Sequence, residues 1–239
     1  MMKLDILVLA AHPDDAELGC AGTIAAHIAQ GYKVGVVDFT AGELGTRGTP
    51  EIRLMEAQRA SEVLGLSVRE NLGFRDGFFS NDEEHQMKLI EVIRKYQPEI
   101  LMINAPSDRH PDHGRASELS TESWFKAGLA AIATFTDGKR QVAWRPKAVY
   151  HYIQARHINP NLIVDVSEFW DKKMEAIHAF TSQFYDPSSK EPETFISSPT
   201  FLKEVEARAR EFGQAIGVEF GEGFVVQRTL GVKNIMEVL

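Results

Sequence analysis

Two short segments of this sequence are dense in histidine and carboxylate side chains. Residues 12–17 read His-Pro-Asp-Asp-Ala-Glu, and residues 108–113 read Asp-Arg-His-Pro-Asp-His. Each segment follows a short apolar run and precedes a helical pattern, so each is predicted to lie where a strand ends and a helix begins. Histidine and carboxylate ligands without cysteine suit a catalytic zinc ion or a similar divalent metal, which takes three protein ligands and leaves one position open for water.

The spacing within the segments indicates which side chains would bind the metal. His12 and Asp15 lie three positions apart on the turn into a helix, so their side chains can converge on one point. His113, at the start of the second helix, is the candidate third ligand from the facing segment. Asp14 and His110 would then remain beside the metal, where a general acid or base and an electrostatic stabiliser are needed.

Helix capping is the simpler interpretation of the same residues. Asp14, Asp15 and Asp112 stand where a carboxylate commonly accepts hydrogen bonds from the free N–H groups of a helix start. For either segment alone, both interpretations stay open. Two such segments at strand ends that meet in the fold favour the metal site. The remaining histidines have no comparable setting and are assigned no role: His27, His85, His151, His157 and His178.

The first half of the chain alternates predicted strands with predicted helices. The strands are predicted over residues 4–11, 33–40, 67–72 and 100–104, and the helices over residues 17–30, 51–64, 82–96 and about 112–126. This alternation indicates an α/β fold with a Rossmann-like, doubly wound, mostly parallel sheet in the order 3-2-1-4-5. In that order the first and fourth strands are neighbours, and ligands bind at their carboxyl ends. The two polar segments would therefore face each other across one cleft.

The second half of the chain is less regular. Strands are predicted over residues 148–153 and 162–166, and helices over residues 168–180 and 201–216. Residues 185–200 carry three prolines and four serines, which predicts a long loop or flap. We therefore expect a single domain over residues 1–239, with a Rossmann-like core over residues 1–127 and an irregular C-terminal elaboration over residues 128–239.

A glycine-rich loop at residues 42–48 follows the second predicted strand. It matches neither the dinucleotide-binding fingerprint nor the Walker A phosphate loop. We expect it to shape the wall of the cleft and to offer Glu43 or Arg47 to a polar substrate.

Composition excludes several other classes of protein. The 239 residues include 26 Lys and Arg against 34 Asp and Glu, a net charge of −8, which argues against general binding to nucleic acid or anionic membranes. The single cysteine, Cys20, excludes an internal disulfide and is interpreted as a small core residue. No apolar stretch approaches the ~20 residues of a membrane helix. The first residues do not form a signal peptide, so a cytoplasmic protein is expected.

At the two polar segments the sequence resembles the PIG-L/LmbE family of zinc-dependent N-acetylglucosamine deacetylases. The matching residues are 11–17 and 110–113, and the resemblance covers nearly the whole chain. More narrowly, the sequence is similar to the branch that deacetylates N-acetylglucosaminyl-malate in bacillithiol biosynthesis. The marks of that branch are Gly42–Thr49, Ile52-Arg53 with Glu56-Ala57, Asp108-Arg109 and Ser182-Gln183-Phe184.

The resemblance implies a role for each residue of the site. The implied metal ligands are His12, Asp15 and His113; the general base is Asp14; the oxyanion stabiliser is His110, with Asp112 beside it as orienter; and the substrate-holding arginine is Arg53. The implied reaction begins when Asp14 takes a proton from the water that attacks the acetamide. The metal and a protonated His110 then stabilise the oxyanion, and acetate and a free amine leave. Related enzymes assemble as homo-oligomers, hexamers or smaller, and the same is expected here.

The malate conjugate makes a further demand on this acidic protein. It carries two carboxylates, so a basic patch is expected near the metal, built from Arg53 and Arg109 with Arg47 behind them. If these arginines pointed away from the metal, the malate substrate would be disfavoured, but the deacetylase assignment would stand.

Other functions stay open. The substrate could be another GlcNAc conjugate or a chitooligosaccharide, and the metal could be Fe²⁺ or another divalent ion. Two histidines and one carboxylate also describe non-haem Fe(II) oxygenases, although those sites usually lie in β-barrels. A non-catalytic sugar-binding or metal-storing module would have a closed metal shell and no need of Asp14 and His110.

Overall fold

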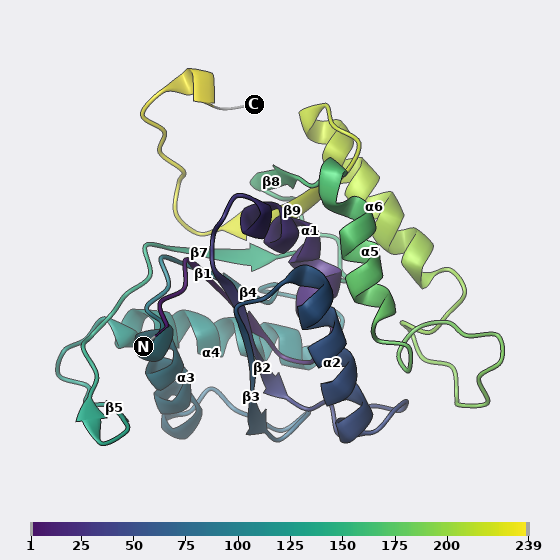
Figure 1. The fold of residues 1–239 in the computed structure, drawn as a ribbon. Coiled ribbons are helices and arrows are strands. Elements are labelled where there is room, and N and C mark those ends of the chain that lie inside the picture. Colours follow the sequence, from purple (N-terminus) through teal and green to yellow (C-terminus); the bar gives the residue numbers. More distant parts are fainter. Residues whose placement is uncertain (1, 238–239) are drawn as a thin grey trace.

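A seven-stranded, mostly parallel β-sheet forms the centre of the computed structural model, which describes residues 2–237 (Figure 1). The strand order is β3-β2-β1-β4-β7-β9-β8. The parallel strands are β3 (Val68–Phe74), β2 (Val34–Thr40), β1 (Ile6–Ala10), β4 (Ile100–Ile103) and β7 (Ala148–Tyr152). They confirm the predicted α/β fold and the order 3-2-1-4-5, with β7 as the fifth strand. The antiparallel strands β9 (Gly221–Val226) and β8 (Leu162–Asp165) extend the sheet at one edge.

Helices cover both faces of the sheet (Figure 1). One face carries α1 (Asp15–Ala29), α2 (Pro50–Leu64) and α5 (Trp170–His178), and the other carries α3 (Glu83–Tyr96) and α4 (Pro111–Ala127). α6 (Phe201–Ile216) packs against β9. The shorter elements are a hairpin of β5 (Phe135–Thr136) and β6 (Lys139–Arg140) and the 3-10 turns η1 (Ser167–Phe169) and η2 (Ile235–Glu237). Residues 185–200, called the flap below, form neither helix nor strand, which confirms the predicted loop.

The central strand β1 is apolar throughout because both of its faces are covered. Leu7 and Leu9 belong to the core under α3 and α4, whereas Ile6 and Val8 belong to the core under α1. Successive side chains of a strand point to opposite faces, so a strand buried on both sides reads as a continuous apolar run. This burial fixes the carboxyl end of β1, where the first polar segment begins.

Helix α1 contains a kink that its sequence does not predict. Cys20 has φ −150° and ψ 21°, which are not helical angles, and its side chain is fully buried as expected. The kink frees backbone N–H groups in the middle of the helix. The carboxylate of Glu222, from β9, accepts hydrogen bonds from the amides of Gly22 (3.0 Å) and Thr23 (2.7 Å). Lys173 of α5 pairs with the same carboxylate at 2.5 Å. Glu222 therefore caps the second half of α1 from strand β9, which the helix contacts.

Strand β9 is the main element that the sequence does not predict. Glycine is depleted in strands, and β9 contains Gly221 and Gly223. A Cβ atom at Gly223 would lie 2.7 Å from the ring of Phe212, so the glycine allows α6 to approach the sheet. The glycines that make β9 hard to recognise in the sequence are thus the residues that allow α6 to pack against it.

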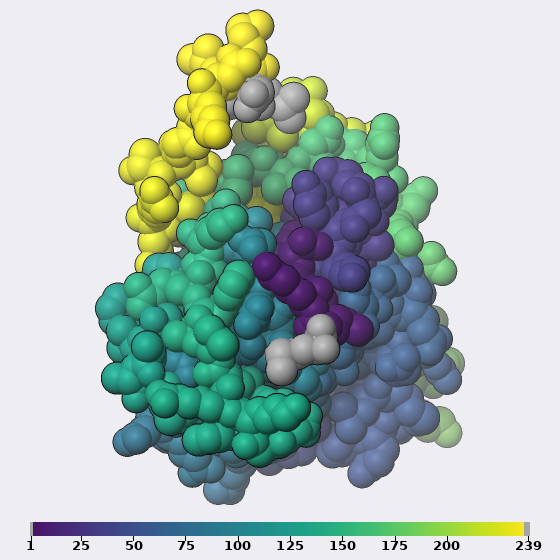
Figure 2. Space-filling view, turned by 60° about the vertical axis from the view of Figure 1, so that its left-hand side comes forward, coloured from purple at the N-terminus to yellow at the C-terminus, as the bar shows by residue number. Residues whose placement is uncertain are grey.

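Residues 227–237, which follow β9, extend away from the body of the molecule (Figure 2). It exposes four large apolar side chains, Leu230, Val232, Ile235 and Met236. Among the described residues, no helix combines the length and the apolar character that crossing a membrane requires.

Candidate active site

A cavity of about 500 Å³ opens where the parallel strands end. Its walls include His12 after β1, Thr46 after β2, Asp76 after β3, His113 after β4 and Gln154 after β7. The flap and α6 complete the walls with Glu193, Thr194, Phe195, Ile196, Phe201, Val205 and Arg208. Both predicted polar segments therefore face one cleft at the carboxyl ends of β1 and β4.

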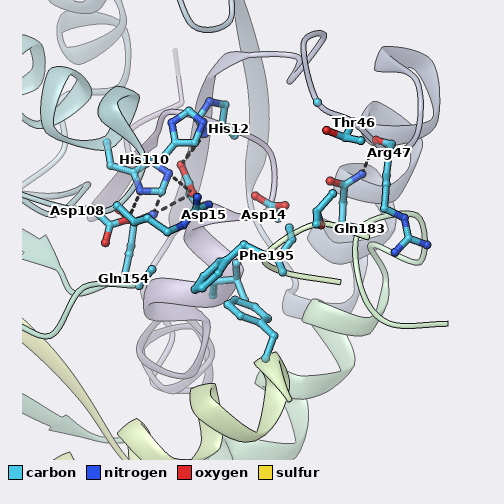
Figure 3. A pocket seen from close by; sticks show the side chains of 18 of the residues that line it. His12, Asp14, Asp15, Thr46, Arg47, Asp108, His110, Gln154, Gln183 and Phe195 are labelled. Carbon is cyan, nitrogen blue, oxygen red and sulfur yellow. Dashed lines mark hydrogen bonds and ion pairs between the residues drawn. The ribbon is translucent and has the colours of Figure 1, made fainter. Parts of the chain in front are cut away.

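His12 and Asp15 lie together at this cavity (Figure 3). His113 lines the same cavity. The Asp15 carboxylate places Oδ2 3.5 Å from His12 Nδ1 and Oδ1 3.0 Å from His113 Nε2. All three residues are buried. Neighbouring ligands of a tetrahedral ion with bonds of 2.0–2.1 Å lie about 3.3 Å apart, which is close to each of these distances, although the two imidazoles face different oxygens of Asp15.

The second ring nitrogen of each histidine contacts carboxylate oxygens, from one residue for His113 and from two for His12. His113 Nδ1 lies 2.5 Å from Asp108 Oδ2. His12 Nε2 lies 3.0 Å from Asp76 Oδ1 and 3.3 Å from Asp112 Oδ2. Metal-binding imidazoles usually donate their second N–H to a carboxylate in this way, which fixes the tautomer and directs the other nitrogen at the ion. These contacts leave His12 Nδ1 and His113 Nε2 as the nitrogens nearest Asp15.

Two other groups of side chains around His12 could hold an ion, and neither includes Asp15. His12, His110 and His113 each offer a nitrogen within 4.8 Å of the others, and a nitrogen of His12 lies within the same distance of carboxylate oxygens of Asp76 and Asp112. His12 belongs to both groups. The cavity thus has an excess of metal-binding donors centred on His12.

Two amide side chains that the sequence analysis did not single out hold Asp15. Gln154 Nε2 donates to Asp15 Oδ1 at 2.8 Å, and Asn104 Nδ2 donates to Oδ2 at 3.0 Å. The backbone amide of His12 also donates to Oδ2 at 3.0 Å. Asp76, Asn104 and Gln154 share one signal that could have found them, because each is a polar residue just beyond the end of a parallel strand.

Asp14 is not a helix cap. It occupies the N-cap position of α1 with a left-handed backbone, φ 109°, but its side chain makes no capping hydrogen bond. Its carboxylate instead lies 3.1 Å from Arg53 Nη2. Burial and the neighbouring Asp15 raise the pKa of Asp14 to about 7, although Arg53 acts in the opposite direction. A buried carboxylate with a pKa near neutrality has the properties of a general base.

Arg53 is wedged between Asp14 and the glycine-rich loop. Its Nη2 also donates to the carbonyl of Pro13 at 2.5 Å. A Cβ atom at Gly42 would come within 1.9 Å of Arg53 Nη1, and Gly42 has φ 65°. Gly42 is therefore required both for the turn and for the space that the guanidinium fills.

His110 and Asp112 are arranged differently from the expected pair. His110 caps α4, because its Nδ1 accepts a hydrogen bond from the Asp112 amide at 3.3 Å. The Asp112 carboxylate orients His12 instead, and it also accepts from the Gly77 amide at 2.9 Å. Burial and the positive charges of His12 and His113 lower the pKa of His110. This favours a neutral imidazole over the protonated form that we expected.

The other expected substrate-binding residues differ in where they point. Arg109 is exposed at the mouth of the cavity, with its guanidinium 4.3 Å from the ring centroid of Phe195. Arg47 lines the cavity, but its guanidinium turns to the flap, where it reaches Ser189 Oγ at 2.7 Å and Glu191 Oε2 at 3.3 Å (Figure 3). Glu43 is not among the lining residues, and its carboxylate accepts from the Asp76 amide at 2.7 Å.

The known proteins that are similar to this chain include deacetylases and a hydratase. The PIG-L family, described as GlcNAc-PI de-N-acetylase, matches residues 7–124. A diacetylchitobiose deacetylase of Thermococcus kodakarensis is 30% identical, over 75% of this chain and 70% of that protein. A 4-oxalmesaconate hydratase of Pseudomonas putida is 29% identical over 74% and 73%, and a probable N-acetyl-alpha-D-glucosaminyl L-malate deacetylase 2 of Bacillus anthracis is 27% identical over 75% and 81%.

A solved structure supports the same grouping. The conserved protein TT1542 of Thermus thermophilus superposes with a TM-score of 0.85 at 35% sequence identity. The match covers 96% of this chain and 98% of that protein. The likeness therefore includes the C-terminal half of the chain, which the family match does not reach.

Proposed function

Because this chain belongs to the PIG-L family of de-N-acetylases, we propose that it hydrolyses the acetamide of an N-acetylglucosamine conjugate, most specifically N-acetylglucosaminyl-L-malate. The observation that carries the proposal is the buried Asp14 carboxylate, free of any capping role, beside two imidazoles that converge on Asp15. The resemblance to the malate branch and the B. anthracis relative support the finer substrate.

We assign His12, Asp15 and His113 as the metal ligands and Zn²⁺ as the metal, with Fe²⁺ suited to the same donors. The carboxylates behind the two histidines and the amides on Asp15 support this assignment over the two alternative groups. When bound, the metal supplies a Lewis acid that polarises the acetamide carbonyl and lowers the pKa of a water molecule.

Asp14 is the proposed general base. Its carboxylate takes a proton from the attacking water and passes it to the nitrogen of the leaving amine, so that acetate and a free glucosamine amine result. The contact with Arg53, at 3.1 Å, holds the carboxylate in place and keeps part of its population ionised near neutral pH. Arg53 is thus assigned a positioning role as well as contact with the substrate.

His110 is the proposed donor to the oxyanion, acting as a neutral imidazole. Its Nδ1 accepts a hydrogen bond from the backbone amide of Asp112, so the proton of the neutral ring resides on Nε2. An Nε2–H group donates a hydrogen bond to a developing oxyanion without the ring having to be charged. Asp112 contributes to this arrangement through its backbone amide, while its carboxylate holds His12.

The test is an assay of amine and acetate release with purified, metal-analysed protein. The substrates are N-acetylglucosaminyl-L-malate, diacetylchitobiose and a neutral methyl N-acetylglucosaminide, each tested without metal, with Zn²⁺ and with Fe²⁺ under anaerobic conditions. We expect stoichiometric amine and acetate from the malate conjugate. Release of amine and acetate from diacetylchitobiose alone would contradict the proposal that the malate conjugate is the substrate. No release from any substrate by metal-loaded protein would contradict the proposed deacetylase function.

The same assay separates the rival functions. An oxygenase would need O₂, a storage or sugar-binding module would release nothing, and a hydratase would consume its substrate without liberating acetate. None of these predicts equal amounts of amine and acetate in the absence of oxygen.

A further inference from the structure

Four arginines line the cavity, and they differ in their counter-charges. Arg47 pairs with Glu191 at 3.3 Å and Arg53 pairs with Asp14 at 3.1 Å. Among the side chains that the structure describes, Arg109 and Arg208 have no carboxylate within 4.0 Å. These two guanidinium groups therefore form no salt bridge, although Asp108, Glu204 and Glu211 act on Arg208 at longer range.

Arg208 is brought to the cavity by the apolar face of α6. Phe201, Val205 and Arg208 all line the cavity, and their spacing of four and three residues puts them on one face of the helix. The guanidinium donates from Nη1 to the carbonyl of Gln154, and its Nη2 lies 3.5 Å from the carbonyl of Ala155. Its remaining N–H donors have no protein acceptor among the described residues.

Of the carboxylates that line the cavity, Asp108 acts on Arg208, and both of its oxygens are already engaged by other groups. Asp108 Oδ2 is held by His113 at 2.5 Å, and Oδ1 accepts from the Arg156 amide at 2.6 Å. Burial lowers the pKa of Arg208 although Asp108, Glu204 and Glu211 act in the opposite direction, which reflects the free-energy cost of enclosing a cation that forms no salt bridge. An anionic group of a bound ligand would offset this cost.

We propose that Arg208, together with Arg109, binds carboxylate groups of the aglycone, so that the enzyme selects GlcNAc conjugates of small carboxylic acids over neutral oligosaccharides. The inference rests on the proposed function, because it places the aglycone in the cavity that receives the acetamide. A guanidinium binds a carboxylate through two parallel N–H···O bonds, which gives geometric selectivity as well as charge. Two such groups match an aglycone with two carboxylates.

A neutral second sugar fits these residues less well. It would cover Arg208 without supplying a counter-charge, and it would compete with the Arg109 guanidinium for the exposed ring of Phe195. The net charge of −8 on the chain repels a dianion at long range, so the two arginines must act locally.

The test compares Arg208→Gln with Arg210→Gln on the same helix. Arg210 is exposed and pairs with Glu206 at 2.9 Å and Glu219 at 3.3 Å outside the cavity, so it is the matched control. We measure kcat and KM for N-acetylglucosaminyl-L-malate and for methyl N-acetylglucosaminide. Arg208→Gln should lower the ratio of kcat/KM between the two substrates at least about tenfold, mainly through KM of the malate conjugate, and Arg210→Gln should leave it unchanged.

Three outcomes would overturn the proposal. One is an equal loss on both substrates, which would mean that Arg208 only supports the Gln154 carbonyl. Another is a wild-type preference for the neutral glycoside. The third outcome begins with a wild-type protein that deacetylates neither substrate, which would contradict the proposed function. Binding of free L-malate is then measured by calorimetry, and a lack of binding would contradict this inference as well. Malate binding that Arg208→Gln abolishes and Arg208→Lys partly restores would support it.

Discussion

The buried carboxylates of this site differ in role because they differ in partners. Asp14 faces Arg53, Asp15 lies between two imidazoles, and Asp108 holds His113. Their pKa values diverge accordingly, since that of Asp14 is raised to about 7 whereas that of Asp15 is lowered by His113 and His12 against the effect of burial. Environment rather than residue type therefore separates the proposed base from the proposed ligand.

Asp14→Asn should separate catalysis from metal binding. The amide keeps the size of the carboxylate but cannot accept a proton, so kcat should fall by about 10²–10⁴. Zinc content, measured by plasma mass spectrometry after gel filtration, should remain at the wild-type level. Asp15→Asn is the matched control, because it should lose the metal. A near-wild-type kcat for Asp14→Asn would refute the role of Asp14.

The acidic side of the pH profile should follow Asp14. A general base works only when deprotonated, so kcat/KM falls as the pH drops through its pKa, and a bound cation moves this fall below about pH 7. Arg53 stabilises the carboxylate, so Arg53→Gln should raise the pKa of Asp14 and move the fall to higher pH. Profiles of kcat/KM measure both. If the pH at which kcat/KM falls is unchanged or lower in Arg53→Gln, Asp14 is not the group that controls the acidic side of the profile.

Elements distant in sequence stabilise the helix that carries two of the proposed site residues. Glu222 of β9 caps the kink of α1 and binds Lys173 of α5, and both side chains are buried. Asp14 and Asp15 lie at the start of the same helix. The C-terminal elaboration thus holds the helix of the N-terminal core in its kinked form.

Glu222→Gln should therefore reduce the free energy of unfolding by about 2–4 kcal/mol, because Lys173 is left buried with its counter-charge removed. Urea denaturation of the metal-free protein measures the change. Glu219→Gln, an exposed neighbour, is the control and should change stability by less than about 0.5 kcal/mol. Combining Glu222→Gln with Lys173→Met should recover part of the loss, and full additivity of the two substitutions would argue against the pair.

The sequence predicts the elements of the first half well and those of the second half poorly. Strands buried on both faces produce apolar runs, and the βαβ rule then fixes their order and the position of the cleft. No such rule applies to an antiparallel strand with two glycines, so β9 was missed. The helix containing Arg208 was predicted, but the face it presents depends on β9. The sequence shows Asp76, Asn104 and Gln154 as polar residues next to strand ends, but which ligand each one holds arises only in three dimensions.

The whole molecule should gain stability from the metal. The proposed ligands come from segments that meet only in the folded state, so the ion binds the native protein far more tightly than the unfolded chain. At a free concentration one hundred times Kd, the gain is about 2.7 kcal/mol. Calorimetric unfolding with and without Zn²⁺ should therefore show a higher Tm for the loaded protein. His113→Ala should abolish the increase, whereas exposed His157→Ala should retain it.

The homo-oligomer expected from the family resemblance stays a prediction. Multi-angle light scattering behind gel filtration measures it directly, and a monomer at micromolar concentration would contradict it. Ile235 and Met236, which are 79% and 85% exposed, are side chains to follow by solvent accessibility in the same experiment.

The substitutions that position 42 tolerates should report on the position of the Arg53 guanidinium. Any side chain there would meet Arg53 Nη1 at 1.9 Å, on a backbone that already has φ 65°. Gly31 also has a positive φ, 91°, but a Cβ atom there would meet nothing within 4 Å. In a saturation library selected for activity, position 42 should accept glycine alone, while position 31 should also accept asparagine and aspartate. Sequencing the survivors would thus detect the Arg53 guanidinium through a residue that itself performs no chemistry.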